Sequence, residues 1–235
     1  MILYALGIGF QRDPLNEKHF NFTYESADEF QSFPTMNVII AHRQSGANLT
    51  VPGIPAFNPM VLLHGEESLE VFSPIESDTT VLVEDTLVDV QDKGKAFILV
   101  YEVKITNKET KELIAKIHQN LFVRAKGGFG HKGTIKNEYP EPPKRAPCAS
   151  IEEVTTKDQA FLYRLSGDLN PLHVDPQMSA MGGFKVPILH GLCTYGVTAK
   201  AVQEKFFPDD PQQLKKFTAR FTSHVFPGET LVVDM

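Results

Sequence analysis

Cysteine and long apolar runs are both scarce in this chain of 235 residues. It has two cysteines, Cys148 and Cys193, and neither stands in a Cys-x-x-Cys arrangement. So few cysteines suit a reducing compartment, and they give neither a readable disulfide framework nor a cysteine-based metal site. No apolar run is long enough to span a bilayer, so we expect no membrane partner.

Basic residues are also fewer than acidic ones, with 23 Lys and Arg against 29 Asp and Glu and a net charge of −6. Nucleic-acid phosphates require a basic surface, which argues against nucleic acid as a partner; a local basic cluster for one phosphorylated cofactor is still allowed. The start, residues 1–13, lacks a basic region and a cleavage site, and the end carries no address, so we expect no targeting signal in this chain. With 42% hydrophobic residues, the chain has enough apolar side chains for a packed core.

Three stretches in the first half have the pattern of long strands. Residues 79–90 alternate, residues 95–106 are rich in β-branched and aromatic side chains, and residues 113–125 continue the pattern. Asp92-Lys93-Gly94, between the first two, is typical of a hairpin turn. We therefore predict an antiparallel meander of three long strands.

A proline-rich segment divides the chain. Residues 136–149 hold Pro140, Pro142, Pro143 and Pro147 among charged side chains, which is typical of a linker. We predict an N-terminal unit at residues 1–135 and a C-terminal unit at residues 150–235.

In the C-terminal unit, Ser150–Glu153 resembles a helix N-cap. Apolar side chains between residues 192 and 206 recur at three- and four-residue spacing, which predicts a helix with one buried face. Residues 217–225 and 230–234 have the composition of strands, with a Pro-Gly turn between them.

An internal repeat suggests how the two units are related. The segment Val71–Asp85 resembles Val225–Asp234, and both place a turn between two strands. Leu63–Gly65 and Leu189–Gly191 are also alike, but in another register, so we prefer the strand–turn–strand match. It predicts an α+β fold with two copies of a helix packed on an antiparallel sheet. The second copy ends early at Met235, so we expect a truncated C-terminal unit or a sheet completed in another way.

Asp168, Asn170 and His173 are the candidates for acid/base chemistry, because they bring a carboxylate, an amide and an imidazole into six positions. Asn170-Pro171 forces a turn that can aim the Asp168 and His173 side chains at one water molecule. We expect burial to raise the pKa of Asp168 and to lower that of His173. Asn170 would donate a hydrogen bond to the water or the carboxylate. Taken singly, each of the three is more simply a helix cap or a satisfied turn residue.

Gly191 opens the predicted long helix, where its backbone N–H can hold a developing oxyanion. Asp175-Pro176 is typical of a cap followed by proline at the first helical position. We expect no metal, because His173 and His190 lack helical i, i+4 spacing and a cysteine partner. Ser166 and Cys193 are weaker candidates for a nucleophile, since Ser166 lacks a Gly-x-Ser-x-Gly turn and Cys193 falls in the apolar helix pattern.

Residues 163–196 contain the segments YRLSGDLNPLHVDP and GFKVPILHGLCTYG. These segments resemble the hydratase 2 domain of peroxisomal multifunctional enzyme type 2, in the MaoC-like (R)-specific enoyl-CoA hydratase superfamily. YALGIG, LLHGEESLEVFSPI, GGFG and ARFTSHVFPGETL stand in the expected order, so the resemblance covers nearly the whole chain. It implies two fused hot-dog units, a double hot dog. It also implies hydration of trans-2-enoyl-CoA to (3R)-3-hydroxyacyl-CoA in fatty acid β-oxidation, with no metal or redox cofactor.

The resemblance also assigns roles to single residues. Asp168 and His173 would hold and activate water with support from Asn170, and the N–H of Gly191 would hold the thioester oxygen. Substrate contacts map onto four residues of this sequence: His64, Gly65, Lys93 and Phe221. Lys93 is otherwise an ordinary solvated turn lysine, and Phe221 an ordinary core residue.

In this family the N-terminal unit accommodates the acyl chain. The resemblance further implies an acyl-CoA as the partner, a homodimer, and a peroxisomal location with the cytoplasm as the alternative. Other functions that the sequence allows are a 3-hydroxyacyl-thioester dehydratase or a thioesterase on the same fold, or a non-catalytic acyl-CoA binding module.

Overall fold

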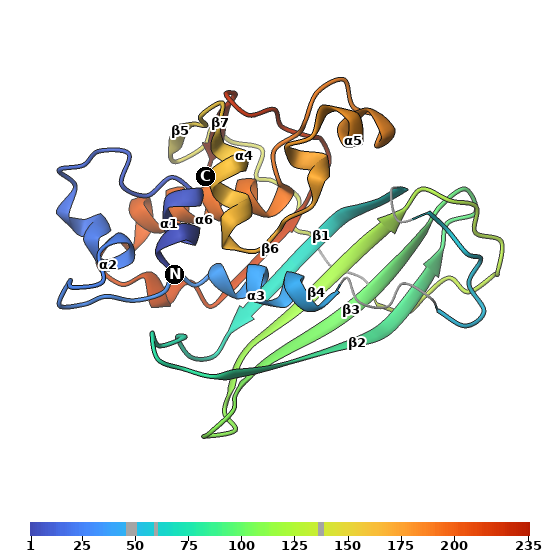
Figure 1. Cartoon of the computed structure of the whole chain (residues 1–235), viewed down its shortest axis with the longest axis horizontal. Helices are drawn as coiled ribbons and strands as arrows, with labels where there is room; N and C mark the ends of the chain where they lie inside the picture. The colour runs from blue at the N-terminus through green and yellow to red at the C-terminus, as the bar shows by residue number, and fades with distance from the viewer. Residues whose placement is uncertain (46–50, 59–60, 136–138) are drawn as a thin grey trace.

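A long antiparallel sheet lies beside a group of helices that surround one long helix (Figure 1). The computed structural model describes residues 1–45, 51–58, 61–135 and 139–235, so the first residues of the predicted linker, 136–138, lie outside the described part. Both chain termini lie on the helical side of the molecule (Figure 1).

The large sheet contains five strands in the order β2-β3-β4-β1-β6. Four come from the first half of the chain and one from the second: β1 (Leu62–Val71), β2 (Val81–Asp92), β3 (Phe97–Asn107), β4 (Leu113–Val123) and β6 (Lys216–Arg220). The predicted three-strand meander is confirmed as β2-β3-β4, with β1 added along β4. Strand β3 is largely buried, in agreement with its apolar sequence.

Strand β1 joins the two units, because its other edge pairs with β6. β1 bulges between His64 and Glu66, so Gly65 is the extra residue, and a Cβ there would lie 3.1 Å from the carbonyl oxygen of Asn120. The pairing with β6 ends at this bulge, where the N–H of Phe221 donates to the Gly65 carbonyl at 2.9 Å. For this reason the predicted strand over residues 217–225 stops at Arg220.

A second, two-stranded sheet pairs β5 (Ser150–Val154) with β7 (Thr230–Asp234). The predicted N-cap at Ser150–Glu153 is therefore wrong. The Ser150 hydroxyl donates across the pair to Asp234 Oδ1 at 2.7 Å, and pairing between distant segments has overridden the local cap pattern. The predicted strand over residues 230–234 is confirmed as β7.

The main helices are α3 (Met36–Ser45) in the first unit and α6 (Gly191–Phe206) in the second. Helix α3 packs against β2, β3 and β4 and also touches α6. The predicted helix over residues 192–206 is confirmed as α6. The shorter helices are α1 (Ile2–Gly7), α2 (Phe20–Thr23), α4 (Gln159–Tyr163) and α5 (Pro176–Met181), with single turns η1 (Glu17–His19), η3 (Arg164–Ser166), η4 (Pro171–His173) and η5 (Pro211–Gln213).

The strand–turn–strand order of the repeat is confirmed, since β1 leads into β2 as β6 leads into β7. The second His-Gly pair has a different place in the fold: Gly65 lies in a strand, whereas Gly191 opens a helix. The proposed register holds only for the second strand: Asp85 lies in β2 and Asp234 in β7, whereas Val71 ends β1 and Val225 lies beyond the end of β6.

One hydrophobic core runs through both units. It joins Tyr4 and Ile8 near the start of the chain to Tyr163, to the α6 residues and to the buried side of β1, β3 and β4. A smaller cluster lies along β3 and β4 and contains Phe97, Leu99, Tyr101, Leu121 and Val123. Within the described ranges, no helix is long and apolar enough to cross a membrane.

Gly196 is the closest point of contact between α6 and the N-terminal segment. A Cβ there would lie 2.5 Å from Ile8 Cγ2 and 2.8 Å from the Tyr4 hydroxyl, which is fixed by a hydrogen bond to Thr35. Alanine gains about 1 kcal/mol in helix propensity over glycine, but overpacking a filled core costs about 1–3 kcal/mol.

We therefore expect Gly196→Ala to lower the free energy of unfolding by about 1 kcal/mol, measured by urea denaturation. Lys205→Ala, an exposed position on the same helix, is the matched control. An unchanged or higher stability of Gly196→Ala would contradict the close packing of α6 on Ile8.

Candidate active site

The turn from Gly167 to His173 presents its two titratable side chains inward. Gly167 has φ 146°, a backbone conformation that favours glycine, and it ends η3. Asn170 then caps η4, its side-chain oxygen accepting from the N–H of Leu172 at 3.1 Å, with Pro171 at the first helical position. Asp168 and His173 are 7% and 8% exposed, so the local turn buries both.

The Asn170 side chain does not donate to the Asp168 carboxylate as expected, because it is exposed and its oxygen caps η4. It supports the carboxylate through the backbone instead, since the N–H of Asn170 donates to Asp168 Oδ1 at 3.1 Å. Asp175 caps α5 as predicted, accepting from the N–H groups of Gln177 and Met178.

His173 is held in one tautomer. Its Nδ1 lies 2.8 Å from the carbonyl oxygen of Ile188, and a carbonyl only accepts, so Nδ1 carries the proton. Nε2 of His173 is therefore an acceptor in the neutral ring. Burial lowers the pKa of His173, as expected, which keeps the ring neutral near pH 7.

Asp168 is paired with a histidine that sequence reasoning missed. Nε2 of His42, on α3 of the first unit, lies 3.2 Å from Asp168 Oδ2. Burial alone raises the pKa of Asp168, but the hydrogen bond and positive charge of His42 outweigh it, and the net pKa lies below its ordinary value. The expected rise is thus reversed, and Asp168 is a carboxylate rather than an acid at neutral pH. No local motif marks His42, because the pairing exists only once α3 packs beside the turn.

His190, just before α6, completes the buried cluster. Its ring stacks on His173 with centroids 3.8 Å apart and an angle of 29°, and its Nε2 lies 3.2 Å from the backbone oxygen of Asp168. It is 1% exposed, and Nδ1 has no hydrogen-bond partner among the residues that the structure describes. Burial, reinforced by the repulsion that would arise if His190 and His173 were both protonated, lowers the pKa of His190 to about 3.

Ligand-type atoms of Asp168, His173 and His190 lie within 4.8 Å of one another, close enough to suggest a metal site. Nδ1 of His173 and Nε2 of His190 already face backbone carbonyls. Stacked imidazoles also direct their in-plane lone pairs side by side, whereas a metal needs them to converge at about 2 Å. The arrangement fits two stacked neutral imidazoles, each hydrogen-bonded to a backbone carbonyl, better than it fits a metal site.

Four further predicted residues meet next to His190, at the start of α6. Gly191 is the first residue of α6, and a Cβ there would lie 3.4 Å from the Phe221 ring. The Phe221 ring lies edge-on to the His64 ring, with centroids 5.4 Å apart. The backbone N–H of Phe221 donates a hydrogen bond to the Gly65 carbonyl oxygen. The bulge of β1 therefore brings His64 and Gly65 to Phe221 and Gly191.

Lys93 stands apart from this group. It lies in the β2–β3 turn, its backbone N–H donates to the Ala96 oxygen at 2.9 Å, and its side chain is exposed. Neither candidate nucleophile is activated: the Ser166 hydroxyl donates to the Tyr163 oxygen, and burial raises the pKa of the Cys193 thiol.

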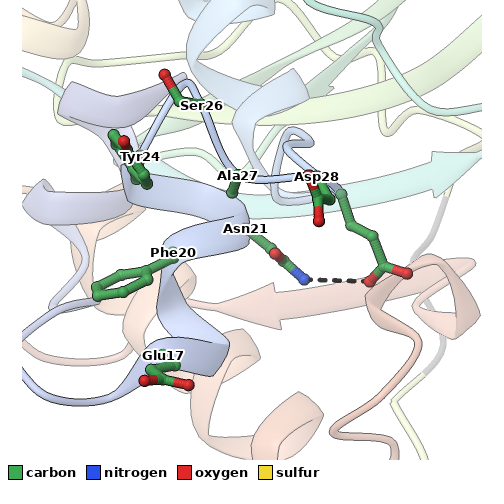
Figure 2. A pocket seen from close by; sticks show the side chains of 8 residues that line it. Glu17, Phe20, Asn21, Tyr24, Ser26, Ala27 and Asp28 are labelled. Carbon is green, nitrogen blue, oxygen red and sulfur yellow. Dashed lines mark hydrogen bonds between the residues drawn. The ribbon is translucent and has the colours of Figure 1, made fainter.

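Figure 2 shows a separate surface hollow formed by η1, α2 and the loop that follows. Three of its lining residues are the carboxylates Glu17, Asp28 and Glu29, and Asn21 donates to Glu29 at 3.3 Å. None of the predicted site residues lines it. Its acidic wall would repel a phosphorylated ligand, so it is not the candidate site.

Comparisons with known proteins place the chain in a family. Residues 1–125 match the family model of the MFE-2 hydratase 2 N-terminal domain, and residues 138–235 match the MaoC like domain. A probable enoyl-CoA hydratase 2 from Dictyostelium discoideum is 42% identical over 237 residues, covering 99% of this chain and 79% of the relative. The chain belongs to the enoyl-CoA hydratase 2 family of MaoC-like proteins.

Solved structures support the same family. Full-length peroxisomal multifunctional enzyme type 2 from Drosophila melanogaster matches with a TM-score of 0.85 and 36% identity, over 99% of this chain and 40% of that one. A MaoC-like dehydratase from Phytophthora capsici matches with a TM-score of 0.86 and 33% identity, over 98% of this chain and 79% of that one. The predicted α+β double hot-dog fold and the resemblance are confirmed, and the enzyme class is that of a hydro-lyase.

The buried, neutral His190 makes stability depend on pH. Its pKa is about 3 in the folded protein and about 6.5 in an unfolded chain, so the unfolded state binds more protons between these values. The free energy of unfolding should therefore fall as the pH falls through this window. Between pH 7 and pH 5 the contribution of His190 to this fall is about 2 kcal/mol.

We expect His190→Phe, which retains a stacked ring but does not titrate, to show a shallower fall between pH 7 and pH 5 in urea denaturation. His224→Phe, at an exposed histidine, is the matched control for the change of ring. Equal pH slopes in wild type and His190→Phe would show that His190 is not held neutral in the folded state.

Proposed function

We propose that this protein catalyses the reversible, (R)-specific addition of water to trans-2-enoyl-CoA, giving (3R)-3-hydroxyacyl-CoA. The observation that carries the proposal is the proximity of Asp168 and His173, which are both buried in one turn and whose ligand-type atoms lie within 4.8 Å of each other. The charge of His42 favours the ionised form of Asp168, and burial favours the neutral form of His173. Two acceptors at one point suit a molecule with two O–H donors, and water is that molecule.

The carboxylate of Asp168 and Nε2 of His173 each accept one hydrogen bond from the water. As the water oxygen bonds to C3 of the enoyl thioester, one of its protons passes to Nε2 of His173. The nearby Asp168 carboxylate stabilises the imidazolium that forms, and the same proton then returns to C2. One water is added in total, without a metal or a redox cofactor.

Gly191 has the role of electrostatic stabiliser in this proposal. When water attacks C3, charge builds on the thioester oxygen as an enolate. The first N–H groups of a helix have no partner within the helix and point out of its N-terminus, where partial positive charge favours an anion. Gly191 is the first residue of α6 and has no side chain to block the thioester.

The substrate would extend from this point in two directions. His64, Gly65 and Phe221 flank Gly191 and are proposed to line the thioester end. Lys93 is exposed at the β2–β3 turn, where its ammonium suits a CoA phosphate. The acyl chain is assigned to the N-terminal unit, and the protein is proposed to act as a homodimer.

We further propose a place in peroxisomal fatty acid β-oxidation. Its support is that the Drosophila relative, matched over nearly all of this chain, is a peroxisomal multifunctional enzyme. Because this chain spans only 40% of that relative, the other activities of the longer enzyme are not transferred to it.

The chemical step can be tested on crotonyl-CoA by following the loss of the enoyl-thioester absorbance. We expect Asp168→Asn and His173→Gln each to lower kcat by about 100-fold or more, because each removes one of the two groups that hold and deprotonate water. His118→Gln removes a histidine on β4 that pairs with Glu102 on β3, away from the candidate site, and it should keep the wild-type rate. Full rate in both site variants, or an inactive wild type, would contradict the proposal.

The same assay separates the alternative functions. Release of free thiol without hydration would identify a thioesterase, and tight acyl-CoA binding without turnover would identify a binding module. A faster reaction from the 3-hydroxyacyl-thioester side would indicate a dehydratase that uses the same groups in reverse.

A further inference from the structure

We propose that His42 is a positioning residue for this reaction, supplied by the N-terminal unit to keep the Asp168 carboxylate ionised and oriented toward water. The proposal deepens the hydratase function and rests on it. His42 lies outside the Asp168–His173 turn and comes from another element, α3.

The geometry of the Asp168 carboxylate supports this role. Asp168 Oδ1 accepts the backbone N–H of Asn170 at 3.1 Å, and Oδ2 faces Nε2 of His42 at 3.2 Å. Two donors from two different elements fix the plane of the carboxylate. A carboxylate oxygen can accept more than one hydrogen bond, so each keeps capacity for water.

Burying the Asp168 carboxylate costs free energy unless a partner offsets it. The Asp168 side chain is 8% exposed, and a buried carboxylate without a partner takes up a proton instead of staying charged. His42 is the one ion-pair partner that the described residues provide for it. Without His42, the two remaining imidazoles beside Asp168 are His173 and His190, and burial lowers the pKa of both.

A second buried acidic group, Glu67, lies beyond His42 and favours its protonated form. The rings of His42 and His64 are nearly parallel, with an angle of 22° and centroids 6.2 Å apart. Nε2 of His64 lies 2.7 Å from Glu67 Oε2, and the Glu67 side chain is 0% exposed. Burial lowers the pKa of His42, but Asp168 and then Glu67 outweigh it, so the net pKa is raised.

The groups that face this pair come from every element around it. They are His173 from η4, His190 from the start of α6, Tyr163 from α4, and His64 and Glu67 from β1. Replacing His42 removes a positive charge near Asp168 and near His173. The pKa of Asp168 and the pKa of His173 should then both rise. Activity requires an ionised Asp168 and a neutral His173, so the acid limb of the pH profile, where activity falls as the pH falls, should move to higher pH.

The experiment compares His42→Leu and His42→Gln with wild type, measuring kcat, KM and the pH profile of kcat/KM on crotonyl-CoA. We expect His42→Leu to lower kcat by about 10- to 100-fold, the size of a lost hydrogen bond to a charged group, with little change in KM. Its acid limb should move up by about one pH unit or more. His42→Gln keeps an N–H donor without the charge, so it should recover most of kcat near pH 8 but retain the shifted acid limb.

His118→Gln is the matched control, because His118 is a similarly half-buried histidine paired with a carboxylate outside the site. The position of the acid limb does not depend on how much of a variant is folded, so a poorly folding His42→Leu still leaves the His42→Gln profile as the test. An active wild type with an unmoved acid limb in His42→Gln would overturn the role of His42 alone. A raised KM with unchanged kcat would also overturn it, whereas an inactive wild type would overturn the hydratase proposal itself.

Discussion

The pairing of β1 with β6 is the contact on which the candidate site depends. It joins the sheet of the first unit to the second, and it ends where β1 bulges at Gly65. At that point Phe221 leaves the strand and lies over Gly191, with His64 against its edge. If the bulge were absent, the ladder would continue and Phe221 would point elsewhere, because successive strand residues face opposite sides.

The site combines groups of opposite character in a small buried space. A carboxylate is kept ionised by a histidine from the first unit, while two stacked imidazoles are kept neutral by burial. A base that takes a proton and a fixed dipole that stabilises the developing negative charge are the two groups needed to add water to an activated double bond. The acid/base work is proposed for Asp168 and His173, and the oxyanion work for Gly191.

Some parts of this arrangement are accessible from sequence because they are local. The Asp-x-Asn-x-x-His turn, the Asp175 cap and the period of α6 each depend on neighbours within one turn or one helix.

Other parts of the fold and the site depend on contacts between distant segments of the chain. Ser150–Glu153 has the chemistry of a cap and forms a strand, because β7 offers it a partner 80 residues later in the chain. His42 has no motif at all, and only the packing of α3 beside the turn reveals it. The predicted rise in the pKa of Asp168 is wrong for the same reason, because the sequence pattern indicates burial but does not show the charge of His42.

The central claim is that this site adds water across the double bond of a trans-2-enoyl-CoA and controls the new stereocentre. The most direct measurement is the configuration at C3 of the product formed from trans-2-enoyl-CoA, read by stereospecific 3-hydroxyacyl-CoA dehydrogenases. The account predicts the (3R) product alone. A (3S) product, a racemic mixture, or no hydration at all would contradict it.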